Sequence, residues 1–304
     1  MDLFIPEEPF DDLSPHEGGP CLGIRVFRPP KTSCRKSIPV VLFLHGGEFV
    51  GGSASDREYH DLCCRFANTG FVVAAPEYRL GSAHPFPAAV EDAYRALAWV
   101  VDEDEMPPEA DCSRIILVGD SNGGGLVAVL SSLVRDGLSG SLEDSSIQNG
   151  FVILHQVIVN GWLFMSETPQ QDPLERKKGR PPKQYTFWPG GEPIERTLQV
   201  YLPSSVRQDA LGDRRCSPWL AGLHDLPCTT VIASRGSPFY KENRRYAERA
   251  TAMGNAVNER VVNDVHGFLT LAMSPRRDQV LAELLSDLQS MHLSSGSACA
   301  CDST

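Results

Sequence analysis

One serine lies in a segment with the spacing of a catalytic nucleophile. Residues 119–123 read Gly-Asp-Ser-Asn-Gly and join an apolar run at 114–119 to a helix-forming run at 123–135. Glycines on both sides of a serine let the chain turn sharply from a strand into a helix and hold the hydroxyl above the sheet edge. The amino end of that helix would place partial positive charge beside a developing oxyanion. Ser121 is therefore the candidate nucleophile; the alternative is a serine that only caps a glycine-rich turn.

A second segment could supply hydrogen-bond donors to the same reaction. Residues 45–49 read His-Gly-Gly-Glu-Phe and follow an apolar run at 39–44. A glycine pair after a strand exposes backbone N–H groups, which acyl transfer needs at the tetrahedral oxyanion. His45 itself is better explained as a structural hydrogen-bonding residue of this turn than as a catalytic base.

A late histidine completes the set of reactive side chains. His266 lies in Val-His-Gly-Phe, shortly after the last strand expected from the sequence. A catalytic imidazole on a loop after a strand, late in the chain, fits the order nucleophile, acid, histidine. His266 is therefore the candidate general base.

Alternating strands and helices would position these groups. Near-continuous apolar runs predict strands buried on both faces, at 22–27, 39–44, 71–75, 114–119, 152–159, 229–234 and 259–262. Segments with helical periodicity lie between them, at 56–68, 88–101, 123–135, 240–253 and 275–291. This alternation predicts an α/β protein with a mostly parallel sheet flanked by helices. Residues 166–218 break the rhythm and are expected to be irregular.

The motifs together resemble the hormone-sensitive-lipase family of α/β-hydrolases, whose members carry His-Gly-Gly-Gly and Gly-Asp-Ser-Ala-Gly-Gly. Residues 78–92, which begin Tyr-Arg-Leu and include His-Pro-Phe-Pro-Ala, are similar to another stretch of that family. The resemblance covers about residues 22–288. It implies the α/β-hydrolase fold, with Ser121 as nucleophile and His266 as general base. The oxyanion donors it implies are backbone N–H groups of Gly46, Gly47, Glu48 and Asn122.

The third member of the triad departs from the family. Where the family has Gly-x-Asp-Pro-Leu, residues 235–239 read Arg-Gly-Ser-Pro-Phe, so Ser237 stands where the acid is expected. A serine can orient the imidazole, but it cannot offset the charge of the imidazolium. Three alternatives stay open. Ser237 is a weak orienting group, a nearby carboxylate (Glu242 or Asp264) replaces the acid, or the reaction is no longer hydrolysis.

Two further departures concern the entrance to the site. Glu48 replaces the third glycine of the family motif, and His45 comes tens of residues earlier than in the family. We therefore expect one domain over residues 1–292 with a shortened N-terminal cap and a lid inserted at about 160–218, followed by a disordered tail at 293–304. Aromatic residues are expected to line a substrate pocket, unless they are ordinary core residues: Phe49, Trp162, Trp188 and Phe268.

Composition excludes several other classes. The chain has 304 residues and a net charge of −11, which argues against nucleic acid and acidic membrane surfaces as partners. We expect no signal peptide, and the longest apolar stretch, at 151–165, is too short to span a bilayer. The nine cysteines include no Cys-x-x-Cys pair, so we expect free thiols, a cytoplasmic protein, and no metal or organic cofactor. A homodimer is left open.

These inferences lead to three hypotheses on function. The first is a serine carboxylesterase that hydrolyses a small, fairly apolar ester through an acyl-enzyme on Ser121. The second is a non-hydrolytic enzyme on the same fold, of the dehydratase or cyclase kind, and the third is a ligand-binding pseudoenzyme. As a compact intracellular esterase with an altered triad, the chain is also similar to tailoring esterases of fungal polyketide pathways, which suggests a role in secondary metabolism.

Overall fold

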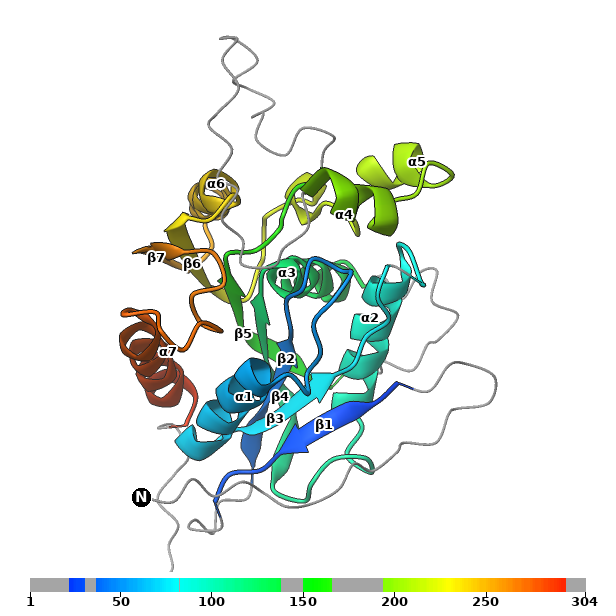
Figure 1. The fold of residues 1–304 in the computed structure, drawn as a ribbon. Helices are drawn as coiled ribbons and strands as arrows, with labels where there is room; N and C mark the ends of the chain where they lie inside the picture. The colour runs from blue at the N-terminus through cyan, green and yellow to red at the C-terminus, as the bar shows by residue number, and fades with distance from the viewer. Residues whose placement is uncertain (1–21, 31–36, 82, 138–149, 166–193, 294–304) are drawn as a thin grey trace, which may run out of the picture.

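The computed structural model of the chain describes residues 22–30, 37–81, 83–137, 150–165 and 194–293 (Figure 1). The described strands are β1 (Ile24–Phe27), β2 (Ile38–Leu44), β3 (Val72–Pro76), β4 (Ala110–Asp120), β5 (Val152–Val159), β6 (Cys228–Gly236) and β7 (Val257–Val265). The α-helices are α1 (Arg57–Thr69), α2 (Ala88–Val100), α3 (Asn122–Arg135), α4 (Ile194–Tyr201), α5 (Arg207–Leu211), α6 (Tyr240–Ala252) and α7 (Arg277–His292).

The strands form one sheet in the order β1-β3-β2-β4-β5-β6-β7. β1 pairs antiparallel with β3, and every other neighbouring pair is parallel. The prediction of a mostly parallel sheet flanked by helices is confirmed. Because β4, β6 and β7 run in the same direction, the residues that follow them emerge at the same edge of the sheet.

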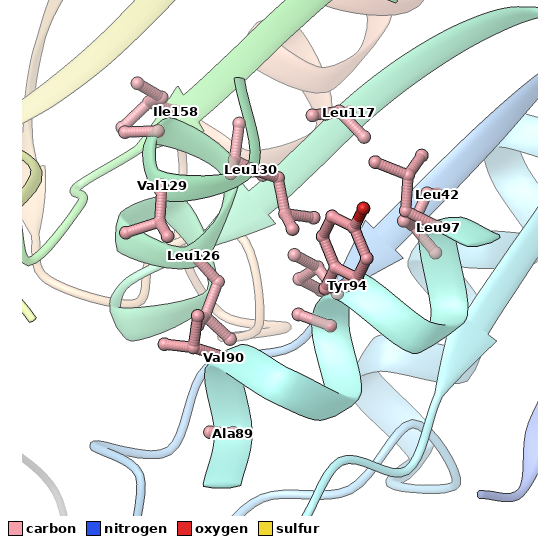
Figure 2. Close-up of a cluster of buried hydrophobic side chains, with 14 of the residues drawn as sticks. Leu42, Ala89, Val90, Tyr94, Leu97, Leu117, Leu126, Val129, Leu130 and Ile158 are labelled. Carbon is pink, nitrogen blue, oxygen red and sulfur yellow. The ribbon is translucent and has the colours of Figure 1, made fainter. Parts of the chain in front are cut away.

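Helices cover both faces of this sheet because its central strands are apolar on both sides. Every residue of β2 is buried, yet successive side chains join different clusters: Leu42 packs on one face and Phe43 on the other. Helices α2, α3 and α6 pack in the cluster that contains Leu42, whereas α1 and α7 pack with Phe43. Figure 2 shows side chains of α2 and α3 meeting those of the strands on the first face.

The prediction that residues 166–218 are irregular is wrong for parts of the described stretch 194–218, and residues 166–193 lie outside the described chain. The described stretch contains α4, α5 and the start of a short 3₁₀ turn at Pro218–Leu220. Helix α4 buries Leu198 and Tyr201, which lie on one face of the helix together with the partly buried Ile194. Figure 1 shows α4 and α5 beyond one end of the sheet, near α3.

Two other expectations concern the ends of the chain and the membrane. The tail expected at 293–304 lies outside the described residues except for Leu293, and residues 1–21 at the start of the chain lie outside them as well. Among the described helices, none is both long and apolar enough to cross a membrane.

The packing of α3 against the sheet should contribute much of the stability, since most residues of this helix are buried. Leu126 is buried to 1% exposure among α2, α3 and the strands. Leu126→Ala should lower the free energy of unfolding by about 2–5 kcal/mol, because it removes apolar contacts and leaves a cavity. Urea unfolding with an unchanged m-value would measure this loss. Leu220→Ala is the control, since Leu220 is 46% exposed; an equal loss in both variants would contradict the placement of Leu126.

Candidate active site

Ser121 forms the turn between β4 and α3. Its backbone has φ 56° and ψ −123°, a conformation that a residue with a side chain rarely adopts. The Ser121 N–H donates to the carbonyl of Val159 at 2.8 Å, and the Ser121 carbonyl accepts from Trp162 N–H at 3.0 Å. The turn is therefore fixed against β5 and the segment after it, as expected of a nucleophile elbow.

Glycine is required at two positions of this turn because backbone passes close by. A Cβ at Gly119 would lie 2.3 Å from the carbonyl oxygen of Gly123, and one at Gly123 would lie 2.1 Å from the carbonyl oxygen of Leu44. Any side chain at either position would push the strand and the helix apart. Glycine is needed at both positions because the chain turns sharply there and passes close to other backbone, as the sequence pattern indicated.

Ser237 and His266 follow adjacent parallel strands. Ser237 comes directly after β6 and His266 directly after β7, and the last paired residues of these strands are Gly236 and Val265. Both side chains are buried, at 6% and 4% exposure. The sheet register therefore brings the two groups together although 29 positions separate them in the sequence.

The three candidate side chains form one hydrogen-bonded line. His266 Nε2 lies 3.0 Å from Ser121 Oγ, and His266 Nδ1 lies 2.8 Å from Ser237 Oγ. The structure thus places Ser237 at the position of the acid in a Ser-His-acid arrangement. Both ring nitrogens of the imidazole are engaged by serine hydroxyls.

A hydroxyl in this position does not fix the tautomer of the imidazole as a carboxylate would. Ser237 Oγ accepts the N–H of Phe239 at 3.1 Å, and within the described part of the chain His266 Nδ1 is the group to which its own proton can be donated. The Ser237 hydroxyl can therefore accept from Nδ1–H or donate to Nδ1, and only the first arrangement leaves Nε2 free to accept a proton from Ser121. A carboxylate accepts only, and it would favour the reactive tautomer.

Burial also weakens the imidazole as a base. It lowers the pKa of His266 to about 3, because the charged imidazolium loses its hydration. The neighbouring hydroxyl of Ser237 carries no negative charge that could raise this pKa. His266 is therefore neutral over a wide pH range but binds a proton weakly.

Glu242, the alternative acid, contacts a different part of the chain. Its Oε1 accepts the backbone N–H of Leu163 at 2.6 Å, and a backbone N–H of Phe164 also hydrogen-bonds the carboxyl group. Burial raises the pKa of Glu242 to about 8 despite these hydrogen bonds. A carboxyl group that is largely protonated at pH 7 supplies little negative charge to His266. The hydrogen bonds of Glu242 instead hold the segment after β5.

Asp264, the other carboxylate considered, ties its own loop together. Its Oδ1 accepts the N–H of Val265 at 2.7 Å, and its Oδ2 accepts the hydroxyl of Ser274 at 2.5 Å. These bonds connect the end of β7 to the segment that leads into α7. Both carboxylate oxygens of Asp264 are therefore hydrogen-bonded within this loop rather than to His266.

In the turn after β2, two of the backbone N–H groups expected to bind the oxyanion already donate hydrogen bonds within the protein. The N–H of Gly46 donates to Tyr59 Oη at 2.9 Å, and the N–H of Glu48 donates to Asn122 Oδ1 at 2.7 Å. The N–H groups of Gly47 and Asn122 donate to no acceptor within the described part of the chain. Of the four donors expected from the sequence, two are therefore committed to holding the turn and two remain available.

A polar network that the sequence did not reveal holds this turn in place. The Asn122 amide donates to Tyr78 Oη at 2.9 Å, and Tyr78 Oη donates to the carbonyl of His45 at 2.6 Å. On the other side, Tyr59 Oη donates to Asp120 Oδ2 at 3.2 Å, and burial raises the pKa of Asp120 to about 7. No local pattern marks Tyr59, although Tyr78 and Asp120 lie in the motifs that carried the resemblance.

The aromatic residues expected in the pocket fall into separate places. Phe49 and Trp162 belong to the cluster that also holds Phe239, which stacks on Trp162 at 5.2 Å and meets the His266 ring edge-on at 5.3 Å. Phe268 is fully buried in the cluster on the other face of the sheet, away from that group. Trp188 lies outside the described residues. The described chain contains no cluster of three or more His, Cys, Asp or Glu side chains that could hold a metal ion.

Comparisons with known proteins agree with this geometry. Residues 41–270 match the model of a protein family described as having the alpha/beta hydrolase fold. The chain is 42% identical to the esterase LipI of Mycobacterium tuberculosis over 261 residues, which cover 83% of this chain and 72% of LipI.

Solved structures give the same result. The esterase of Pyrobaculum calidifontis superposes with a TM-score of 0.72 at 28% identity, covering 95% of this chain and 87% of that esterase. EstE1, a thermostable carboxylesterase cloned from a metagenomic library, superposes with a TM-score of 0.72 at 29% identity, covering 90% and 86% of the two chains.

The unusual backbone of Ser121 should be visible in stability. Ser121→Gly and Ser121→Ala remove the same hydroxyl, but only glycine tolerates a positive φ without strain. Ser121→Gly should therefore be more stable than Ser121→Ala by about 1 kcal/mol, measured by urea unfolding, although glycine normally destabilises. If Ser121→Ala were the more stable variant, the strained conformation assigned to this residue would be wrong.

Proposed function

Since the chain belongs to the alpha/beta hydrolase fold family and is a carboxylic ester hydrolase, we propose that it cleaves a small, fairly apolar ester through an acyl-enzyme on Ser121. The observation that carries this proposal is the 3.0 Å contact between Ser121 Oγ and His266 Nε2. A serine hydroxyl at hydrogen-bond distance from an imidazole is the arrangement that activates a nucleophile.

The first half of the proposed reaction forms the acyl-enzyme. Ser121 Oγ attacks the carbonyl carbon while its proton passes to His266 Nε2, and the carbonyl electrons move to the oxygen. The N–H groups of Gly47 and Asn122 are available to stabilise this oxyanion, and α3 directs its amino end toward it. When the carbonyl re-forms, the ester C–O bond breaks, and the alcohol leaves with the proton from Nε2.

The second half reverses these roles with water as the nucleophile. Water attacks the acyl carbon and gives a proton to His266 Nε2, and collapse of the second oxyanion returns that proton to Ser121 Oγ. The carboxylic acid is then released. In both halves Ser237 acts as the proposed orienting group for Nδ1, in place of an acid.

The proposal predicts a slow enzyme. In a serine protease, replacing the acid of the triad by its neutral amide, which presents the wrong tautomer, lowers kcat by roughly 10⁴. Ser237 presents a neutral hydroxyl that can favour either tautomer, so the same kind of physical cost applies here. The aromatic group of Phe49, Trp162 and Phe239 beside His266 supports a preference for an apolar ester.

The sequence left a non-hydrolytic reaction and simple ligand binding open, but the similarity to esterases argues against both, and product analysis tests them. Hydrolysis adds water across the ester, whereas elimination or cyclisation loses water or leaves the mass unchanged. A role in secondary metabolism, a cytoplasmic location and a homodimer also stay predictions.

The role of Ser121 is tested by removing its hydroxyl. Ser121→Ala should abolish hydrolysis of p-nitrophenyl acetate to the level of the uncatalysed reaction, because no acyl-enzyme can form. Release of p-nitrophenolate would be measured at equal concentrations of folded protein. Equal rates for Ser121→Ala and the natural protein would exclude the serine mechanism.

The role of residue 237 is tested by restoring a charge. Ser237→Asp should raise kcat at least tenfold, because a carboxylate accepts from Nδ1–H and stabilises the imidazolium. The base must be neutral to act, so activity is lost as the pH falls through the pKa of His266. That acid limb should move upward from about 3 toward the ordinary histidine value of about 6.5.

Two matched variants control this experiment. Ser237→Asn has the size of aspartate without its charge, so the acid limb should not move as it does in Ser237→Asp. Glu242→Gln should leave the pH profile unchanged, since Glu242 binds backbone N–H groups of the segment after β5. A pH shift in Glu242→Gln, or equal profiles for the asparagine and aspartate variants, would assign the supporting group elsewhere.

A further inference from the structure

Two consecutive residues of the turn after β2 have an unfavourable backbone conformation. Glu48 has φ 60° and Phe49 has φ 63°, and both are residues with a large side chain. Only glycine adopts such angles freely, so contacts with the surroundings must hold this turn. Gly47, whose N–H is available to the oxyanion, directly precedes them.

Part of this support comes from the backbone and from α3. The N–H of Glu48 donates to Asn122 Oδ1 at 2.7 Å, and the carbonyl of Phe49 accepts the N–H of Gly81 at 2.6 Å. These bonds connect the main chain of the turn to Asn122, next to Ser121, and to Gly81. They leave the large side chains of Glu48 and Phe49 to be held by other elements.

Helix α4 holds both of these side chains. Thr197 Oγ1 donates to Glu48 Oε2 at 2.8 Å, and the ring of Tyr201 stacks on the ring of Phe49 at 4.0 Å with an interplanar angle of 6°. Thr197 and Tyr201 lie four residues apart, on the same face of α4. Thr197 is 1% exposed and Glu48 is 6% exposed, so the hydrogen bond between them is shielded from water.

We propose that Thr197 is a positioning residue for the oxyanion turn, acting through the carboxylate of Glu48 to set the position of the Gly47 N–H. The proposal rests on the proposed function, since it matters only if an oxyanion forms at that N–H. It makes α4, a helix more than 140 positions away in the sequence, part of the device that stabilises the transition state. A glycine in place of Glu48 would need no such support.

A loss of this hydrogen bond should affect the chemical step more than substrate binding. The oxyanion exists only after attack on the carbonyl, so a displaced donor weakens the transition state and leaves the ground state largely unchanged. A shift of about 1 Å in a catalytic donor has a large effect on rate. We therefore expect a fall in kcat with little change in KM.

The experiment compares Thr197→Val with Thr197→Ser in hydrolysis of p-nitrophenyl acetate. Valine keeps the shape and loses the hydroxyl, and kcat should fall about tenfold with KM within about twofold. Serine keeps the hydroxyl and should restore kcat to within about twofold of the natural protein. Thr251→Val is the matched control, because the Thr251 hydroxyl donates only to Ala247 within α6; its kcat should not change.

A second background tests whether the effect passes through Glu48. In Glu48→Gly, which has no carboxylate and tolerates the positive φ, replacing Thr197 by valine should change kcat by less than twofold. If Thr197→Val alone fails to fold, judged by circular dichroism, Thr197→Ala against Thr197→Ser gives the same comparison. An unchanged kcat in Thr197→Val, or an equal loss in the Glu48→Gly background, would overturn the proposal.

Failure of this inference is distinct from failure of the proposed function. If hydrolysis disappears in Ser121→Ala but kcat is unchanged in Thr197→Val, only the positioning role is overturned. Hydrolysis that persists in Ser121→Ala would overturn the serine mechanism, and with it the role assigned to the turn.

Discussion

The imidazole of His266, held between two serine hydroxyls, is the interaction on which the rest of the site depends. It requires three parallel strands to end at one edge of the sheet, because Ser121, Ser237 and His266 follow β4, β6 and β7. It also requires the sharp turn at Ser121, which Gly119 and Gly123 allow. The three side chains thus have the arrangement of a catalytic triad, with an uncharged hydroxyl at the position of the acid.

In the proposed mechanism, the uncharged Ser237 makes proton transfer the weaker contribution and oxyanion stabilisation the stronger one. Burial lowers the pKa of His266 to about 3, and Ser237 offers no negative charge against it, so proton transfer from Ser121 is less favourable than in a complete triad. The oxyanion turn, in contrast, is braced from several sides by Asn122, Tyr59 and the side chains of α4. Fixed donors of this kind contribute about 10²–10³ each to catalysis in other enzymes, so much of the remaining rate enhancement is expected from this side of the site.

The sequence was informative wherever a local pattern had a local cause. All seven predicted strands and five predicted helices occur within a few residues of their expected positions, because periodic burial determines them. Ser121 and His266 could be proposed for the same reason, since a glycine-flanked serine and a histidine after the last strand are local patterns. Ser237 was found only through comparison with a family motif, as nothing in Arg-Gly-Ser-Pro-Phe marks it alone.

The rest depends on contacts between distant segments. Three features follow only from tertiary packing. The N–H of Glu48 donates to Asn122, Glu242 binds the segment after β5, and Phe268 belongs to the other face of the sheet. Helix α4 was missed although Ile194, Leu198 and Tyr201 have helical spacing, because the helix has only eight residues and lies in a stretch expected to be irregular.

The measurement that tests the central claim most directly is the pH dependence of labelling by a fluorophosphonate probe, followed by mass spectrometry of the modified peptide. The account predicts slow labelling at Ser121 that persists below pH 5, because the base stays neutral when its pKa is near 3. Labelling that is absent from Ser121, or that disappears around pH 6.5 as for an ordinary histidine, would contradict it.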